Sequence, residues 1–155
     1  MATYLEKFFR LLKTLNEHAV DYILIGGLAM IIHGFNRFTS DVDLFIRNTP
    51  ENIDKLKMAL RSLYDDPAID EITLEELTQY PVIRYGTPDD FYIDMMIRLG
   101  EAFNFDNLNS EIVEYQGIEI NVATLESLYL LKKDTLREKD QLDLLFLKKL
   151  NREKR

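Results

Sequence analysis

A segment of six residues, 41–46, constrains the fold of this chain more than any other, because it reads Asp-Val-Asp-Leu-Phe-Ile. Successive side chains of a β-strand point to opposite faces, so the alternation predicts a half-buried strand with Asp41 and Asp43 on one face. Residues 91–96 form a second candidate strand, which carries Asp94 on its polar side. The two segments predict a sheet with one apolar face packed against helices and three carboxylates on the other.

Three carboxylates on the uncovered face of one sheet repel one another unless a cation lies between them. Oxygen ligands of this kind suit Mg²⁺, which proteins bind through a few carboxylates together with substrate phosphates. The simpler interpretation is a solvated strand edge, which is what a lone Asp-x-Asp usually marks. The spacing alone leaves both interpretations open.

A glycine pair, Gly26-Gly27, ends the apolar run 22–25, which predicts a buried strand. Glycine permits a tight turn and lets backbone N–H groups approach an anion. Residues 28–33 predict a short helix whose N-terminus would point to the same place and favour phosphate. A turn needed only for chain reversal is the alternative.

The loop between the glycine pair and the acidic strand carries Arg37, Thr39 and Ser40. Arg37 has the charge to neutralise a triphosphate, and either hydroxyl could brace the carboxylates; a solvated surface arginine is the alternative. The chain has two His and no Cys. This excludes a disulfide framework and a cysteine nucleophile, and it disfavours a zinc site.

The remaining pattern indicates a single α+β domain over residues 1–155, a mixed sheet with helices mainly on one face. The acidic stretch 65–79 predicts a loop with a helical turn. The other elements expected from periodicity are helices within 5–15, 53–63, 125–133 and 138–151, and strands at 81–85, 112–115 and 118–122.

The net charge of −8 argues against a protein that coats nucleic acid through overall positive charge. The charge is uneven, because residues 132–155 carry nine basic and five acidic side chains. The longest uncharged apolar run, residues 22–32, is too short for a membrane helix, which needs roughly 18 residues, and no signal-peptide core is present. We therefore expect a cytoplasmic protein without a membrane segment.

The motifs together resemble those of the nucleotidyltransferase superfamily, most closely its minimal, AbiEii-like members found in toxin–antitoxin and abortive-infection systems. Thirteen residues separate Gly27 from Asp41. The segments that carry the resemblance are Gly26-Gly-Leu-Ala29, His33-Gly34 and Arg37-Phe-Thr-Ser-Asp-Val-Asp-Leu44. Leu28 is a departure, because many relatives have serine at that position of the turn.

The resemblance extends through residues 132–144, similar to the family's helical Lys, Arg and Lys-Asp-x-x-Asp element, and so covers roughly residues 5–150. It implies the polymerase-β-like nucleotidyltransferase fold with a C-terminal helical pair. Among the C-terminal residues it suggests Lys132, Lys139 and Asp140 as nucleotide or structural contacts. Helix-spaced surface ion pairs are the alternative for these three.

For the chemistry, the resemblance implies transfer of a nucleoside monophosphate from a nucleoside triphosphate to a hydroxyl on tRNA, a protein or a small molecule. Asp41, Asp43 and Asp94 would hold one or two Mg²⁺ ions, with Asp94 as ligand, general base or both. Gly26 and Gly27 would hold the terminal phosphates. A regulatory partner of a neighbouring gene's product, or a nucleotide-binding domain with little turnover, are the alternatives.

Overall fold

The computed structural model describes residues 3–99 and 103–132. The predicted final helix, 138–151, lies outside them. The elements in chain order are α1 (Tyr4–Glu17), β1 (Tyr22–Ile25), α2 (Gly26–Ile32), β2 (Asp41–Ile46), α3 (Pro50–Leu63), a 3₁₀ helix (Pro67–Glu71), α4 (Leu74–Gln79), β3 (Ile83–Gly86), β4 (Tyr92–Met96), β5 (Arg98–Leu99), β6 (Phe103–Asn104), β7 (Ser110–Tyr115), β8 (Ile118–Ala123) and α5 (Leu125–Lys132).

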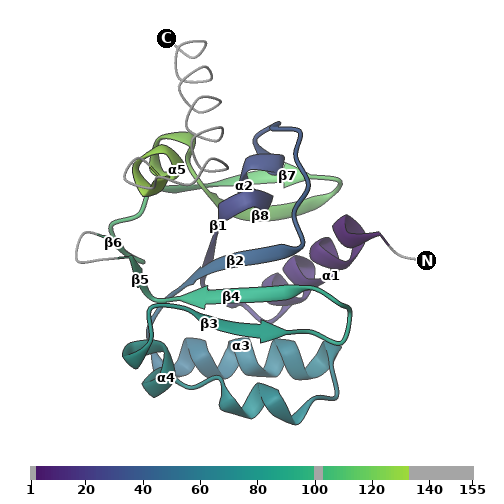
Figure 1. The fold of residues 1–155 in the computed structure, drawn as a ribbon, viewed down its shortest axis with the longest axis vertical. Helices are drawn as coiled ribbons and strands as arrows, with labels where there is room; N and C mark the ends of the chain where they lie inside the picture. Colours follow the sequence, from purple (N-terminus) through teal and green to yellow (C-terminus); the bar gives the residue numbers. More distant parts are fainter. Residues whose placement is uncertain (1–2, 100–102, 133–155) are drawn as a thin grey trace.

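The main sheet is mixed, with six strands in the order β3-β4-β2-β1-β8-β7 (Figure 1). β2 runs parallel to β4 and antiparallel to β1, and β1 runs parallel to β8. The edge strands β3 and β7 are each antiparallel to their neighbours. The predicted α+β class and mixed sheet are therefore confirmed, and β5 with β6 adds a small second sheet that periodicity did not reveal.

Two capped helices cover the apolar face of the sheet. The side chains of Thr3 and Thr49 accept hydrogen bonds from backbone N–H groups in the first turns of α1 and α3, and Pro50 opens α3. α1 packs against α3. Phe8 of α1 meets Phe91, which precedes β4, edge to face with ring centroids 5.0 Å apart. The helices thus lie on the face opposite the carboxylates.

Two local predictions need correction. α2 begins at Gly26 rather than two residues later, so the glycine pair is its first turn. Residues 65–79 are more ordered than expected, because Thr73 caps a short helix, α4, by accepting from the N–H of Glu76. The ring Nε2 of His33 lies 2.8 Å from the carbonyl oxygen of Ala123 and so links the end of α2 to β8.

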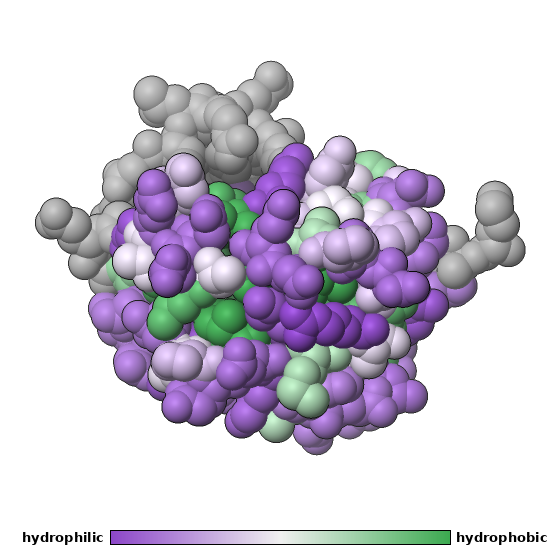
Figure 2. Space-filling view, turned by 90° about the horizontal axis from the view of Figure 1, so that it is seen from below, coloured by the Kyte–Doolittle hydropathy of each residue, from purple (hydrophilic) through white to green (hydrophobic). Residues whose placement is uncertain are grey.

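None of the helices in the described part of the chain is long and apolar enough to cross a membrane. The face seen from below is largely hydrophilic, with hydrophobic side chains showing near its centre (Figure 2). The large hydrophobic side chains exposed among the described residues are Phe38, Met58, Tyr80, Val82, Tyr92, Ile112 and Leu130. Phe38, at 74% exposed, is the most exposed of these.

Candidate active site

The parallel pairing of β2 with β4 brings the predicted carboxylates together. In its register Asp43 lies directly opposite Asp94, and Asp41 lies opposite Tyr92. Asp94 is buried, with 8% of its surface exposed, whereas the side chain of Asp41 is 28% exposed. The structure therefore places the three acids on one face of two adjacent strands.

Asp43 is the acid most affected by this crowding. Burial, the largest cause, acts together with the charge of Asp94, a hydrogen bond to it and the charge of Asp41 to raise the pKa of Asp43 from 3.8 to about 7. The positive charge of Lys132 acts in the opposite direction. A carboxyl placed this way holds a proton near neutral pH unless a cation takes the proton's place.

Arg84, which was not among the predicted site residues, neutralises part of the negative charge from the edge strand β3. The antiparallel register of β3 and β4 sets Arg84 opposite Asp94. Its Nε and Nη2 donate to the two carboxylate oxygens of Asp94 at 2.9 and 3.0 Å, and Nη2 lies 3.4 Å from Asp41 Oδ2. The guanidinium also lies over the ring of Tyr92, 4.5 Å from its centroid.

This donor set fits a divalent cation, because three carboxylates supply the hard oxygen ligands that Mg²⁺ takes. Within residues 3–99 and 103–132, no group of three or more His, Cys, Asp or Glu side chains is already arranged as a metal site. Asp94 and Asp41 meet at Arg84 instead. The guanidinium therefore supplies the positive charge that a metal ion would supply.

The turn at Gly26 lies directly against the carboxylate of Asp43. Gly26 has a φ of +73°, in the region that favours glycine, and a Cβ there would overlap Asp43 Oδ2 and lie 2.7 Å from its Cγ. The absence of a side chain is thus what lets the first turn of α2 approach the acid.

Gly27 lies beside two of the predicted loop residues. A Cβ added to Gly27 would lie 3.2 Å from Thr39 Oγ1 and 3.6 Å from Arg37 Cζ. Thr39 Oγ1 accepts from the N–H of Asp41 at 3.3 Å and lies 3.2 Å from its carbonyl oxygen, so it fixes the start of β2 rather than a carboxylate. The hydroxyl of Ser40 lies 3.5 Å from Asp41 Oδ1. The structure therefore brings the glycine turn, this loop and the acids to one place.

The predicted C-terminal contacts divide into two groups. Lys132 is the last residue of α5, and its charge reaches the acidic cluster, since it lowers the pKa of Asp43. Lys139 and Asp140 lie outside the described residues.

A hollow of about 430 Å³ adjoins the loop. Arg37 and Thr39 contribute to its wall, so it opens next to the glycine turn. Its aromatic lining residues are Tyr4, Phe35, Phe38 and Tyr115. The exposed ring of Phe38 therefore lines this hollow, with its centroid 5.9 Å from that of the Tyr4 ring.

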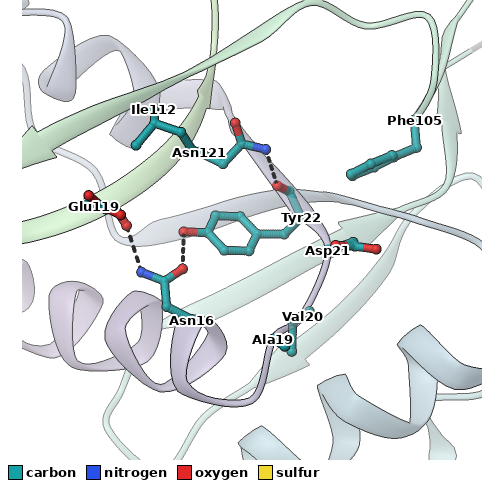
Figure 3. Close-up of a pocket in the computed structure, with 9 residues that line it drawn as sticks. All are labelled: Asn16, Ala19, Val20, Asp21, Tyr22, Phe105, Ile112, Glu119 and Asn121. Atoms are coloured by element: carbon teal, nitrogen blue, oxygen red, sulfur yellow. Dashed lines mark hydrogen bonds between the residues drawn. The ribbon is translucent and has the colours of Figure 1, made fainter.

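A second hollow, of about 440 Å³, lies at the opposite end of β1, where Tyr22 pairs with Ile46 (Figure 3). There the hydroxyl of Tyr22 donates to Asn16 Oδ1 at 3.0 Å, and Asn121 Nδ2 donates to the carbonyl of Tyr22 at 2.8 Å. Burial raises the pKa of the Tyr22 hydroxyl to about 12. These polar groups bind one another, which is the pattern of a structural network.

Comparison with known proteins agrees with this geometry. The family model described as nucleotidyl transferase AbiEii toxin, type IV toxin–antitoxin system, matches residues 10–151. A search of curated proteins found no significant match.

Among solved structures, the lincosamide antibiotic adenylyltransferase LnuA bound to lincomycin is similar at a TM-score of 0.63 and 17% identity, over 92% of this chain and 95% of that one. The putative nucleotidyltransferase TM1012 of Thermotoga maritima has a TM-score of 0.55 at 17% identity, over 97% and 90%. JHP933 of Helicobacter pylori gives 0.52 at 17%, over 94% and 65%. At this identity the structures establish a shared fold.

Proposed function

We propose a function from one premise, which is that this chain belongs to the AbiEii nucleotidyl transferase family. The function is Mg²⁺-dependent transfer of a nucleoside monophosphate from a nucleoside triphosphate to a hydroxyl acceptor. The observation that carries it is the meeting of Asp41, Asp43 and Asp94 beside the Gly26 turn.

In this reaction the acceptor hydroxyl oxygen forms a bond to the α-phosphorus, and the bond from that phosphorus to pyrophosphate breaks. Bound Mg²⁺ would neutralise the phosphates and favour the deprotonated acceptor. Asp41 and Asp43 would hold it, with Asp94 as a further ligand or as the base that takes the hydroxyl proton. Gly27 and Arg37 line the adjoining turn, where backbone N–H groups and the guanidinium suit the pyrophosphate.

The first test uses each α-³²P-labelled nucleoside triphosphate with Mg²⁺ and a pool of acceptors that includes purified tRNA. ATP is the first choice because the similar LnuA is described as an adenylyltransferase. We expect transfer by the natural protein and a loss of at least about a thousandfold in Asp43→Asn, since removing a metal-holding charge costs several kcal/mol of transition-state stabilisation. Transfer that persists in a folded Asp43→Asn would overturn the assignment of the site.

A second candidate function is binding of a partner protein within a toxin–antitoxin pair, which the description of the matched family favours. Co-expression with the product of the neighbouring gene tests it by size-exclusion chromatography. A stable complex, with transfer activity that changes when the complex forms, supports a regulatory pair. An unchanged elution volume and unchanged activity contradict it.

A further inference from the structure

Arg84 is the charged side chain that contacts two of the three clustered acids. It occupies both carboxylate oxygens of Asp94, and the same guanidinium reaches Asp41. Those two acids are 11% and 28% exposed at their side chains, whereas Arg84 itself is 53% exposed. The arginine therefore covers the acids from the solvent side.

The chain contains a second arginine in a comparable arrangement, which shows what such contacts do away from the acids. Arg47 donates to Asp21 at 3.0 Å and to Asp106 at 2.9 Å, and it lies 4.4 Å from the centroid of the Phe105 ring. The two carboxylates are 54% and 79% exposed, so they remain well solvated. Arg47 follows β2 at the end opposite Asp41, which makes it a matched control.

We propose that Arg84 is the counter-ion of the acidic cluster in the metal-free protein and that Mg²⁺ must displace it from Asp94 and Asp41 to bind. This proposal rests on the proposed function, because it takes the three acids to be the metal site. The carboxylate oxygens that Arg84 binds are the ones that a metal ion would coordinate. A guanidinium and a divalent cation cannot both bind the same oxygens.

Two features of the geometry favour displacement over a permanent ion pair. The exposed position of Arg84 lets the side chain move into solvent without opening the core. The ring of Tyr92, 4.5 Å beneath the guanidinium, gives Arg84 a cation–π contact that does not use the carboxylate oxygens. Arg84 is thus a positioning residue, which keeps the acids oriented and partly neutralised until metal binds.

The test is isothermal titration of MgCl₂ into the nucleotide-free protein, comparing the natural chain with Arg84→Met, Arg84→Lys, Arg47→Met and Asp43→Asn. Removing the competing cation should tighten Mg²⁺ binding by about five- to tenfold in Arg84→Met. The Mg²⁺ affinity of Arg84→Lys should lie between those of the natural protein and Arg84→Met, because lysine keeps the charge but loses the bidentate contact. Arg47→Met makes the same change of net charge and should shift the affinity by less than about twofold, since exposed charges at that separation are screened.

Thermal unfolding gives a second measurement, which stays informative if a variant is weakened. In EDTA, Arg84→Met should melt several degrees below Arg47→Met, because Asp94 and Asp41 are left without their counter-ion. Saturating Mg²⁺ should then remove most of that difference.

The possible results separate the two levels of the proposal. Equal Mg²⁺ affinity in the natural protein and Arg84→Met, together with loss of binding in Asp43→Asn, keeps the metal site and overturns the role of Arg84. Weaker binding in Arg84→Met overturns it as well. Absence of Mg²⁺ binding in every variant contradicts the metal site itself, and the role of Arg84 with it.

Discussion

Strands β1 and β2 carry polar groups at both ends, and the two ends differ in how those groups are paired. At one end Asn52, 3% exposed, accepts from the N–H of Asp21 at 2.7 Å and donates to the carbonyls of Asp21 and Arg47 at 2.9 and 3.0 Å. At the other end Asp43 and Asp94 face each other across β2 and β4.

The two ends therefore differ in whether their buried polar groups are paired. Around Asn52 each buried polar group has a partner of opposite hydrogen-bonding character, so the network holds α3 to the start of β1. At the carboxylate end like charges are buried together, which raises the pKa of Asp43 to about 7. A cost of this kind in the folded state, beside a glycine turn, is typical of a functional site.

The largest expected effect on stability comes from Gly26→Ala, which fills the space between the turn and Asp43. The added Cβ would overlap the carboxylate, and the φ of +73° adds backbone strain. We expect a loss of about 3 kcal/mol in the free energy of unfolding and of at least about a hundredfold in transfer. Chemical denaturation and the labelled transfer assay measure the two.

Gly117→Ala is the matched control, because Gly117 has a similar φ of +81° and nothing within 4 Å of its added Cβ. It should cost only about 1 kcal/mol from the backbone and leave transfer intact. Equal effects of the two substitutions would mean that Gly26 has no special relation to Asp43.

The next effect is a dependence of stability on pH. Because the pKa of Asp43 rises from 3.8 to about 7 on folding, its contribution favours the folded state below about pH 4 and is lost as the pH rises toward 7. Between pH 5 and pH 8, in EDTA, the free energy of unfolding should therefore fall by about 2–3 kcal/mol from this group.

Denaturation curves of the natural protein and of Asp43→Asn at both pH values isolate that contribution. The natural protein should lose more stability than the variant over this range. Parallel pH profiles would show that Asp43 titrates normally and that the two ends of the strands do not differ as described.

The smallest of the three effects is expected from Asn52→Ala at the opposite end. The substitution leaves the N–H of Asp21 and the carbonyl of Arg47 without their partner, whereas the carbonyl of Asp21 still accepts from the N–H of Arg47. We expect a cost of about 2 kcal/mol in the free energy of unfolding. Specific transfer activity of the folded fraction should stay unchanged. A loss of activity beyond the loss of folded protein would mean that this end also takes part in function.

Much of the carboxylate end could be predicted from the sequence, because the information is local. The alternation in 41–46 placed Asp41 and Asp43 on one face, and the structure has β2 with those same bounds. After Leu44 the alternation no longer predicts burial. Phe45 lies on the same face of the strand as Asp43 and is nevertheless fully buried. The glycine pair likewise marked the turn that approaches the acid.

Arg84 could not be predicted, because its role depends on pairing between strands. The sequence predicts a strand at 81–85, in which Arg84 lies between Ile83 and Tyr85. Only the register, which sets Arg84 opposite Asp94, shows that it meets two acids. That register depends on a turn in which Thr87 bonds to Phe91 and on the packing of Tyr85 in the core.

The central claim is that the carboxylate end binds a divalent cation together with a nucleoside triphosphate. The most direct test is paramagnetic broadening by Mn²⁺ in the ¹⁵N-labelled protein with a nucleoside triphosphate present. We predict selective loss of the amide signals of Gly26, Asp43 and Asp94, while those of Asn52 and Tyr22 persist. Excess Mg²⁺ should restore the lost signals. Uniform broadening, or broadening centred on the Asn52 end, would contradict the account.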